Sequence, residues 1–170
     1  MARLILTGFM ATGKTEVGRL LARRLGRPFV DTDGLIETAA RRSVAQIFAV
    51  DGEAHFRALE RHAVEEACAV PDAIIATGGG TLLDPENHRR LAAAGPVVCL
   101  TASPEEIGRR VGDVSSRPLL VGHNGDRLAR IRTLLDERAP AYALATHTVD
   151  TSGLTVEQVA ERVQALVAGR

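Results

Sequence analysis

A single lysine stands among the basic residues of this chain, and all the others are arginine. Lys14 lies in GFMATGKT, residues 8–15, where Gly8, Gly13, Lys14 and Thr15 match the pattern GxxxxGK followed by Ser or Thr. The segment follows a short apolar run and precedes a helical pattern, which is the context that this phosphate-binding loop requires. Glycines let the backbone wrap an anion, and the N–H groups of the turn and of the helix N-terminus point toward it. The motif therefore predicts a site for the phosphates of a nucleoside triphosphate.

Lys14 and Thr15 have different expected tasks in this loop. A compact ammonium on a flexible stem can follow the terminal phosphates while charge moves between them, whereas a guanidinium is bulkier and planar. Thr15 is expected to place its hydroxyl on Mg²⁺, since a small hard cation takes oxygen ligands and commonly bridges phosphates to one or two protein groups. The alternative is a glycine-rich turn with a solvated lysine, and the agreement of motif, context and single lysine argues against it.

Asp31 and Asp33, in DTD, follow the second short apolar run. The run AIIAT leads into three glycines, residues 78–80, rather than into the acidic residue expected after a Walker B strand, so a second metal-side carboxylate must come from elsewhere. Two carboxylates one residue apart can divide the labour, one facing the metal and the other facing a substrate hydroxyl. An aspartate in such a turn is also a common helix cap, so both interpretations stay open at this point.

Arg57 and the glycines of residues 78–80 are further candidates on the acceptor side. Arg57 lies in GEAHFRALERH, on a predicted helix, where a lone arginine is more often a solvated charge. Three consecutive glycines remove every side chain at the end of a strand, where α/β proteins place ligands. Close approach of the backbone to a ligand explains these glycines better than a plain turn does.

Apolar runs with strand character alternate with helical patterns along the chain. The runs cover residues 4–6, 29–30, 73–76, 97–100 and 147–149, and the helical patterns cover residues 14–25, 34–42, 44–48, 53–70, 85–94, 104–111, 127–138 and 156–167. This alternation predicts an α/β fold with a parallel sheet. Asp84 before Pro85 and Ser103 before Pro104 predict helix starts, because a capping side chain precedes a proline at the first helical position. Thr155 is expected to cap the last helix.

Composition and charge are those of an ordinary globular chain. Of 170 residues, 45% are hydrophobic and 25% are charged, the formal net charge is zero, and one domain spanning residues 1–170 is expected. The scattered arginines give no electrostatic footprint for a nucleic-acid backbone or an anionic membrane. No apolar run approaches the roughly 18 residues of a membrane span, and the N-terminus lacks the anatomy of a signal peptide. We therefore expect a cytoplasmic protein without a nucleic-acid or membrane partner.

Residues 112–125, GDVSSRPLLVGHNG, show neither helical nor strand periodicity. A loop of that length inside a compact domain is usually functional or disordered. A mobile lid is the preferred interpretation over an idle surface insertion.

Two cysteines and a tyrosine attract structural roles. Cys68 and Cys99 lack the spacing of a metal site, so two reduced, buried cysteines are expected rather than a bridge. Tyr142 is expected to pack rather than to react.

Six segments taken together carry a resemblance to a known family. GFMATGKT, DTD, GEAHFR, ATGGG, RPLL and ERAPAY, in this order and spacing across nearly the whole chain, resemble shikimate kinase. The resemblance implies a P-loop kinase fold, similar to that of nucleoside monophosphate kinases: a three-layer sandwich whose five-stranded parallel sheet is flanked by helices. It also implies a substrate-binding segment at about residues 31–62 and a mobile lid at about residues 112–125. The implied activity is that of an ATP- and magnesium-dependent transferase of the shikimate pathway, in aromatic amino-acid biosynthesis, which phosphorylates the 3-hydroxyl of shikimate.

On the nucleotide side, the resemblance implies roles for the matching positions. Mg²⁺ would meet Thr15 and, through water, Asp31. Arg110 would lie near the adenine, where a guanidinium can stack on the base, and Arg117 would reach from the lid over the transferring phosphoryl group. The implied nucleotide-binding set is Gly8, Ala11, Thr12, Gly13, Lys14, Thr15, Glu16, Arg110 and Arg117.

On the acceptor side, the resemblance implies that Asp33 binds substrate hydroxyls and accepts the proton of the attacking one. Arg57 and Arg138 would clamp the shikimate carboxylate, because a guanidinium pair selects an acid over a neutral polyol. The implied acceptor-binding set is Asp33, Phe48, Phe56, Arg57, Gly79, Gly80 and Arg138, and the implied catalytic residues are Lys14, Asp33 and Arg117. The protein is expected to act as a monomer.

The chain departs from the family pattern at two places in the phosphate loop. Ala11 stands where glycine is frequent, and Thr15-Glu16 stands where Ser-Thr is frequent, so loop conformation and nucleotide affinity are the properties at issue. Two rival functions stay open. One is another small-molecule P-loop kinase, acting on gluconate or a nucleoside monophosphate, and the other is a non-catalytic nucleotide-binding switch.

Overall fold

The computed structural model describes residues 2–112, 117–120 and 126–168. Its centre is a sheet of five strands in the order β2-β3-β1-β4-β5, and all neighbouring strands are parallel. The strands are β1 (Leu4–Gly8), β2 (Phe29–Asp31), β3 (Ile74–Ala76), β4 (Val97–Thr101) and β5 (His147–Asp150). Each strand lies within two residues of a run that the sequence predicts, so the α/β class with a parallel sheet is confirmed.

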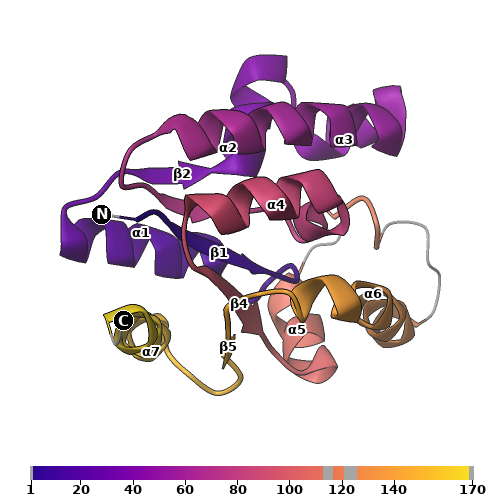
Figure 1. The fold of residues 1–170 in the computed structure, drawn as a ribbon. Coiled ribbons are helices and arrows are strands. Elements are labelled where there is room, and N and C mark those ends of the chain that lie inside the picture. The colour runs from indigo at the N-terminus through magenta and orange to yellow at the C-terminus, as the bar shows by residue number, and fades with distance from the viewer. Residues whose placement is uncertain (1, 113–116, 121–125, 169–170) are drawn as a thin grey trace.

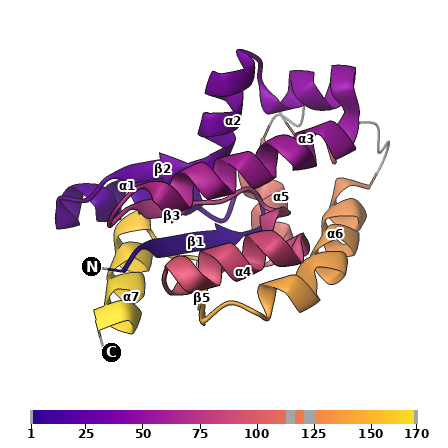
Figure 2. The ribbon, with the colours of Figure 1, turned by 45° about the horizontal axis from the view of Figure 1, so that its top comes forward.

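Helices cover both faces of the sheet. They are α1 (Lys14–Leu25), α2 (Thr32–Ala40), α3 (Val44–Ala69), α4 (Pro85–Ala94), α5 (Pro104–Val111), α6 (Arg127–Tyr142) and α7 (Val156–Ala168), with a short 3₁₀ turn, η1 (Thr81–Leu83), before α4. In Figures 1 and 2, α1 and α7 lie on one side of the strands, and α3 and α4 lie on the other. This arrangement is the expected three-layer sandwich. Most of the loop interpreted as a lid, residues 113–116 and 121–125, lies outside the described residues.

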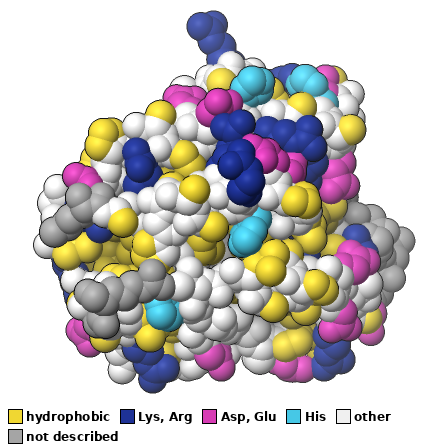
Figure 3. Space-filling model, viewed as in Figure 1, with side chains coloured by type: hydrophobic (Ala, Val, Ile, Leu, Met, Phe, Trp, Pro, Cys, Tyr) yellow, Lys and Arg dark blue, Asp and Glu magenta, His cyan; other side chains and the backbone are white. Residues whose placement is uncertain are grey.

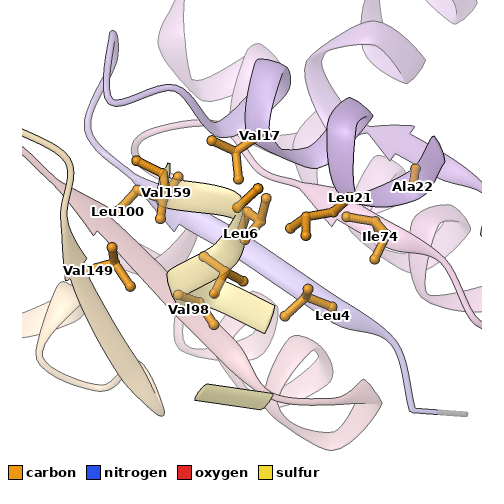
Figure 4. Packing of buried hydrophobic residues seen from close by; sticks show 12 residues of the cluster. Leu4, Leu6, Val17, Leu21, Ala22, Ile74, Val98, Leu100, Val149 and Val159 are labelled. Carbon is orange, nitrogen blue, oxygen red and sulfur yellow. The ribbon is translucent and has the colours of Figure 1, made fainter. Parts of the chain in front are cut away.

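The strands send alternate side chains into two separate cores, because successive residues of a strand point to opposite faces of the sheet. Leu4 and Leu6 of β1 join a cluster with residues of α1 and α7, which Figure 4 shows from close by. Ile5, between them, joins the cluster under α3 and α4. Continuous apolar strands are typical of a parallel sheet covered on both faces, which explains why these runs lack strict alternation in the sequence.

Capping side chains place several helix starts where the sequence predicts them. Asp84 accepts a hydrogen bond from the backbone N–H of Glu86, and Ser103 accepts one from that of Glu106. At α7, the Thr155 hydroxyl accepts from the Gln158 N–H while the Gln158 side chain accepts from the Thr155 N–H. These local bonds satisfy donors that a helix N-terminus leaves without partners.

The long element α3 contains a break at Gly52, whose φ of 84° and ψ of 172° are not helical. Figure 2 shows the change of direction between the two segments. The separate helices predicted before and after this residue are therefore present as two segments of one element. The break matters for the site, because it brings Phe48 and Phe56 from its two sides to a ring-centroid distance of 4.7 Å.

Two helices, α2 and α6, have bounds that differ from those predicted by two residues or more. α2 runs over Thr32–Ala40 rather than residues 34–42, because Asp31 caps its start and Arg41 takes a left-handed conformation with φ 52° at its end. α6 continues past the predicted end at Arg138 to Tyr142, although Pro140 lies inside it.

The cysteines are both free, as expected, but only Cys99 is fully buried, whereas Cys68 is partly exposed. Among the described residues, no helix combines the length and the apolar character that crossing a membrane requires. On the face seen in Figure 3, arginine side chains lie beside carboxylates, in keeping with a formal net charge of zero.

Candidate active site

Two adjoining cavities lie at the carboxyl ends of the strands. The larger, of about 350 Å³, is lined by Met10, Asp33, Glu37, Val44, Phe48, Phe56, Arg57, Glu60, Gly78, Gly79, Gly80, Arg117, Pro118, Leu119 and Arg138. The smaller, of about 260 Å³, is lined by Met10, Ala11, Gly13, Lys14, Thr15, Glu16, Asp31, Asp33, Thr77, Gly78, Gly79 and Arg117. The two cavities share a boundary, and the residues that line both are Met10, Asp33, Gly78, Gly79 and Arg117. The whole acceptor-binding set lines the larger cavity.

The sheet order explains why these segments meet. The connection after β1 leads to β2 on one side, while the connection after β3 leads to β4 on the other, so the strand order reverses between β1 and β3. Such a reversal opens a crevice beyond the carboxyl ends of the two strands, where α/β proteins bind ligands. The phosphate loop follows β1, and the three glycines follow β3.

Lys14 sits inside the phosphate loop, where its ammonium Nζ donates a hydrogen bond to the carbonyl of Phe9 at 2.8 Å. Burial lowers the pKa of Lys14 to about 8; the nearby Asp33 and Asp31 carboxylates oppose this fall, and the Arg117 charge adds to it. A lysine whose charged form is costly gains from the arrival of a polyanion.

Gly8, Ala11 and Thr12 set the backbone conformation of the loop. A Cβ on Gly8 would lie 2.1 Å from the carbonyl oxygen of Leu100 in β4, so the neighbouring strand demands glycine there. The Thr12 side chain is buried and donates to the Phe9 carbonyl at 2.8 Å. Ala11 adopts φ 59°, the left-handed region that favours glycine, which explains why glycine suits this position and why alanine is strained in it.

Thr15 and Asp31, the expected metal pair, are in contact. The Thr15 hydroxyl donates to Oδ2 of Asp31 at 2.9 Å, while Oδ1 of Asp31 accepts from the backbone N–H of Asp33 at 3.0 Å. Asp31 is therefore a helix cap through one oxygen and a partner of Thr15 through the other, so capping is confirmed and the metal-side role stays a prediction. A hydroxyl and a carboxylate side by side supply the oxygen ligands that Mg²⁺ prefers.

Asp33 carries a buried oxygen, Oδ1, that has no hydrogen-bond partner among the described residues. Burial, together with the charges of Asp31 and Glu60, raises the pKa of Asp33 to about 6, although Lys14 opposes this rise. Because the folded state holds this proton more tightly than the unfolded chain does, Asp33 lowers folding stability as the pH rises from about 4 to about 6. A destabilised carboxylate with an open oxygen is suited to accept a proton or a hydroxyl group.

Arg57 is held by two carboxylates of its own helix. Its Nη1 donates to Glu60 at 2.9 Å and its Nη2 donates to Glu53 at 3.2 Å. Burial lowers the pKa of Arg57, but the two carboxylates outweigh it and the pKa rises above its usual value. Glu60 is itself buried and also accepts from the Thr81 hydroxyl at 2.6 Å.

Sequence reasoning missed Glu60, which fixes Arg57 beside the cavity. The spacing of three residues on a helix was a usable signal, since such positions face each other. Whether a glutamate on a helix is buried depends on the tertiary fold, so nothing in the sequence indicated the burial of Glu60. The larger cavity is also lined by Met10, Val44, Pro118 and Leu119. Their residue types do not indicate a binding site.

Arg138 differs from Arg57 in having no counter-ion among the residues that the structure describes. Its side chain is 3% exposed, and no described carboxylate lies within ion-pair distance of it. Its guanidinium lies 5.1 Å from the ring centroid of Phe9, whose π-face offsets part of the cost of burying the charge. A buried, uncompensated cation is expensive, so a cavity that keeps one is suited to an anionic ligand.

Each of the three glycines leaves room for a different functional side chain. A Cβ on Gly78 would lie 2.9 Å from Glu60 and 3.1 Å from Asp33. One on Gly79 would lie 3.0 Å from Nη1 of Arg138, and one on Gly80 would lie 2.6 Å from Nη2 of Arg57. The groups that approach the triplet in this structure include the charged side chains of the cavity, and close approach of a ligand to this backbone stays a prediction.

The remaining predicted residues fall into three places. Phe48 and Phe56 form an apolar wall of the larger cavity, and Glu16 lies at the exposed rim of the smaller one. Arg117 has a buried Nε without a partner among the described residues, at the boundary of both cavities. Arg110 lines neither cavity.

Arg110 is tied instead to the backbone beside the phosphate loop. It donates to the Ala11 carbonyl at 3.3 Å and to both the hydroxyl and the carbonyl of Thr151 at 3.0 Å. These bonds link the strained loop residue to the start of the segment that leads into α7.

Comparisons with known proteins agree with this geometry. The family model described as "Shikimate kinase" matches residues 10–168. The shikimate kinase of Thermoanaerobacter pseudethanolicus is 45% identical over 163 residues, covering 96% of this chain and 94% of that protein, and the shikimate kinase of Pelotomaculum thermopropionicum is 46% identical with the same coverage.

Solved structures give the same answer. Shikimate kinase from Acinetobacter baumannii in complex with shikimate superposes with a TM-score of 0.94 at 32% identity, covering 100% of this chain and 95% of that one. Shikimate kinase from Aquifex aeolicus superposes with a TM-score of 0.82 at 30% identity, covering 98% and 96%. A gluconokinase from Sinorhizobium meliloti, with a TM-score of 0.61 at 15% identity, shares the fold alone. The matched family model, the identity over nearly the full length and the paired cavities together show that this chain belongs to the shikimate kinase family.

Proposed function

We propose that this protein transfers the terminal phosphoryl group of ATP to the 3-hydroxyl of shikimate, giving shikimate 3-phosphate and ADP. The observation that carries the proposal is Arg138, which is buried without a counter-ion in the described part of the chain. It lines a cavity together with Arg57, and this cavity adjoins the one at the phosphate loop. Two guanidinium groups beside one cavity are suited to a carboxylate. A hydroxylated acid is therefore the acceptor class that the larger cavity favours.

On the acceptor side, Arg57 and Arg138 hold the carboxylate, and Phe48 and Phe56 pack against the ring. Gly79 and Gly80 let the ring come close to the backbone. Asp33 binds the hydroxyl that reacts, since its open oxygen lies at the boundary between the two cavities. This assignment places the acceptor hydroxyl next to the phosphates.

On the nucleotide side, the backbone of residues 8–15 and the Lys14 ammonium bind the phosphates, with Glu16 at the rim. Thr15 and Asp31 would hold Mg²⁺, which supplies charge neutralisation at the phosphates when it is bound. Arg110 lies near the adenine, and Arg117 neutralises charge on the transferring group from the boundary of the cavities.

The chemistry asked of these residues is mainly positioning and charge stabilisation. The bond between the acceptor oxygen and the terminal phosphorus forms while the bond from that phosphorus to the bridging oxygen of ADP breaks. The hydroxyl proton passes to the carboxylate of Asp33. The pKa of this carboxyl, about 6, lies nearer to neutral pH than that of an ordinary aspartate. Lys14 and Arg117 stabilise the charge that moves toward the leaving phosphate.

A panel of acceptors tests the proposal. ADP release is measured with a coupled assay in the presence of shikimate, gluconate or a nucleoside monophosphate, and shikimate is expected to be the efficient acceptor. Equal turnover with gluconate would contradict the substrate assignment. Nucleotide binding without turnover on any acceptor would indicate a nucleotide-binding switch instead.

We further propose that residues 1–170 act as one domain and as a monomer in the cytoplasm, without a nucleic-acid or membrane partner. Two free cysteines fit a reducing compartment. Light scattering on the purified protein, with and without both substrates, measures the oligomeric state, and a stable dimer would contradict the monomer.

A further inference from the structure

Tyr142, the last residue of α6, reaches across to the glycines of the site. Its hydroxyl donates a hydrogen bond of 2.6 Å to the carbonyl oxygen of Gly79. Gly79 and Gly80 line the larger cavity, whereas Tyr142 is not among the residues that line it. The tyrosine therefore supports this wall of the cavity from behind.

The same phenol lies beside the unpaired arginine. Arg138 precedes Tyr142 by four residues on α6, and positions four apart share a helix face. Burial raises the pKa of Tyr142 to about 12, and the charge of Arg138 and its hydrogen bond with the phenol oppose that rise. The hydroxyl thus stays protonated near neutral pH and can donate to Gly79, the residue on which an added Cβ would lie 3.0 Å from Nη1 of Arg138.

The bond to Gly79 has a consequence for the next residue. The carbonyl of Gly79 and the N–H of Gly80 belong to one planar peptide unit and point in opposite directions when that unit is trans. The described residues contain no cis peptide bond. Holding the Gly79 carbonyl toward α6 therefore turns the Gly80 N–H away from Tyr142. Glycine has no side chain to restrict this peptide, so an outside contact has to set its orientation.

Packing alone does not account for a tyrosine here. The ring of Tyr142 packs beside the apolar cluster that includes Phe9, Ile131 and Leu134, a task that phenylalanine performs equally well. A buried hydroxyl carries a desolvation cost that only a hydrogen bond offsets. The bond to Gly79 is that compensation, and it connects α6 to a segment 63 positions away in the sequence.

We propose that Tyr142 is a positioning residue for the acceptor: its hydroxyl fixes the Gly79–Gly80 peptide and the Arg138 guanidinium in the relative geometry that binds the carboxylate-bearing substrate. This inference rests on the proposed function, because it assigns Tyr142 to the acceptor side of that site. Tyr142 itself touches neither substrate nor nucleotide.

The test is the Tyr142→Phe variant of the full chain, which removes the hydroxyl and keeps the ring. The KM and the calorimetric Kd for shikimate are expected to rise about 3- to 10-fold, the range that the loss of one buried hydrogen bond supports. The KM for ATP is expected to stay within about twofold, since α6 does not form the phosphate loop, and kcat is expected to fall less than the affinity for shikimate.

Ile131→Val is the matched control, because it lies on the same helix, in the same apolar cluster, and outside both cavities. Removing one buried methylene there lowers folding stability by an amount similar to the loss of one hydrogen bond. Its affinity for shikimate is expected to match the wild type. If Ile131→Val weakens shikimate as much as Tyr142→Phe does, the effect is a softened helix and the proposal is overturned.

The chain offers a direct spectroscopic readout, because it contains one tyrosine and no tryptophan. Tyrosine emission from the native protein therefore reports Tyr142 alone. Titration with shikimate in the absence of nucleotide is expected to change this emission saturably, with the calorimetric Kd, since the carboxylate neutralises the guanidinium beside the phenol. If calorimetry shows that shikimate binds but the tyrosine emission does not change, the proposed link between Tyr142 and the acceptor site is overturned.

The two hypotheses fail in different ways. If the wild-type protein does not bind shikimate, the proposed function fails, and the role of Tyr142 falls with it. If the wild type binds shikimate and Tyr142→Phe binds it equally well, the proposed function stands and the positioning role alone is refuted.

Discussion

Arg57 and Arg138 line the same cavity but sit in opposite electrostatic surroundings. Arg57 is neutralised by Glu53 and by the buried Glu60, whereas Arg138 is buried without a carboxylate among the described residues. The first arginine is oriented by its partners, and the second is kept at a cost to stability. A site that holds an uncompensated charge for its ligand is expected to trade folding stability for binding.

The trade can be measured by replacing each arginine with methionine. Arg138→Met removes an unpaired buried charge and is expected to stabilise the ligand-free protein by about 1–3 kcal/mol, whereas Arg57→Met leaves Glu60 buried without its cation and is expected to destabilise it. Both variants are expected to lose about 2–5 kcal/mol of shikimate binding. Chemical denaturation measures the free energy of unfolding, and calorimetry measures the affinity for shikimate. Equal destabilisation by both variants would show that burial of the Arg138 charge does not lower folding stability.

Lys14 predicts a proton linkage of nucleotide binding. With a pKa of about 8 instead of 10.5, the folded protein holds fewer protons on Lys14 than the unfolded chain does between these values, so folding stability rises with pH across that window. The phosphates of ATP favour the ammonium and raise its pKa again. At pH near 8, ATP binding is therefore expected to take up roughly half a proton at this group.

Calorimetry of ATP binding in buffers of different ionisation enthalpy measures this uptake. The Lys14→Met variant is the control, since it has no group to protonate at this position. A heat that is independent of the buffer in the wild type would refute the linkage.

At the scale of elements, the segment of residues 78–80 is a shared seam between helices. α3 presents Arg57 and Glu60 to it, α2 presents Asp33, and α6 presents Arg138. A Cβ on Gly78 would meet Glu60 and Asp33, one on Gly79 would meet Arg138, and one on Gly80 would meet Arg57. The segment therefore sets the spacing between side chains of three helices. Glycine is required at these positions because a Cβ on Gly78, Gly79 or Gly80 would lie 2.9, 3.0 or 2.6 Å from the nearest of these side chains.

Gly80→Ala tests this role of the seam. The added methyl would lie 2.6 Å from Nη2 of Arg57, so the guanidinium has to move, and the KM for shikimate is expected to rise about tenfold or more while that for ATP changes little. Gly108→Ala on α5 is the control, because its methyl would meet only Ile131, at 3.8 Å, and its helix propensity improves. Steady-state kinetics of both variants measure these KM values. An unchanged KM for shikimate in Gly80→Ala would refute the requirement for glycine at this position.

At the scale of the whole molecule, the reversal of strand order between β1 and β3 brings the nucleotide and acceptor segments to one edge of the sheet. The acceptor-binding residues line one cavity at this edge. A ligand that binds only the folded protein stabilises it, so shikimate is expected to stabilise the fold.

Shikimate alone, without nucleotide, is expected to raise the thermal midpoint of the protein. At about 100 times its Kd, a ligand adds about 2.7 kcal/mol of stability, which corresponds to a shift of roughly 5–10 °C for a domain of this size. The carboxamide analogue of shikimate is expected to give a much smaller shift, because it lacks the charge that Arg138 requires. Equal shifts with acid and amide would contradict the carboxylate clamp.

The sequence by itself determined the local features of this protein. The phosphate loop, the apolar strands and the capped helix starts depend on residues close together in the chain, and the six family segments, read in order, determined the family and its fold. The chemistry of Lys14, Thr15, Asp31 and Asp33 follows from their types and their neighbours. For the same reason the starts of α4, α5 and α7, each of which has a local cap, were predicted to the residue.

The tertiary structure decided what depends on distant contacts. The burial of Glu60, the absence of a carboxylate beside Arg138 in the described residues, and the bond from Tyr142 to Gly79 each join segments far apart in the sequence. The continuation of α6 past Pro140 has the same origin, since its last residue is anchored on another segment. Burial and long-range hydrogen bonds exist only once the chain has folded, so no local pattern encodes them.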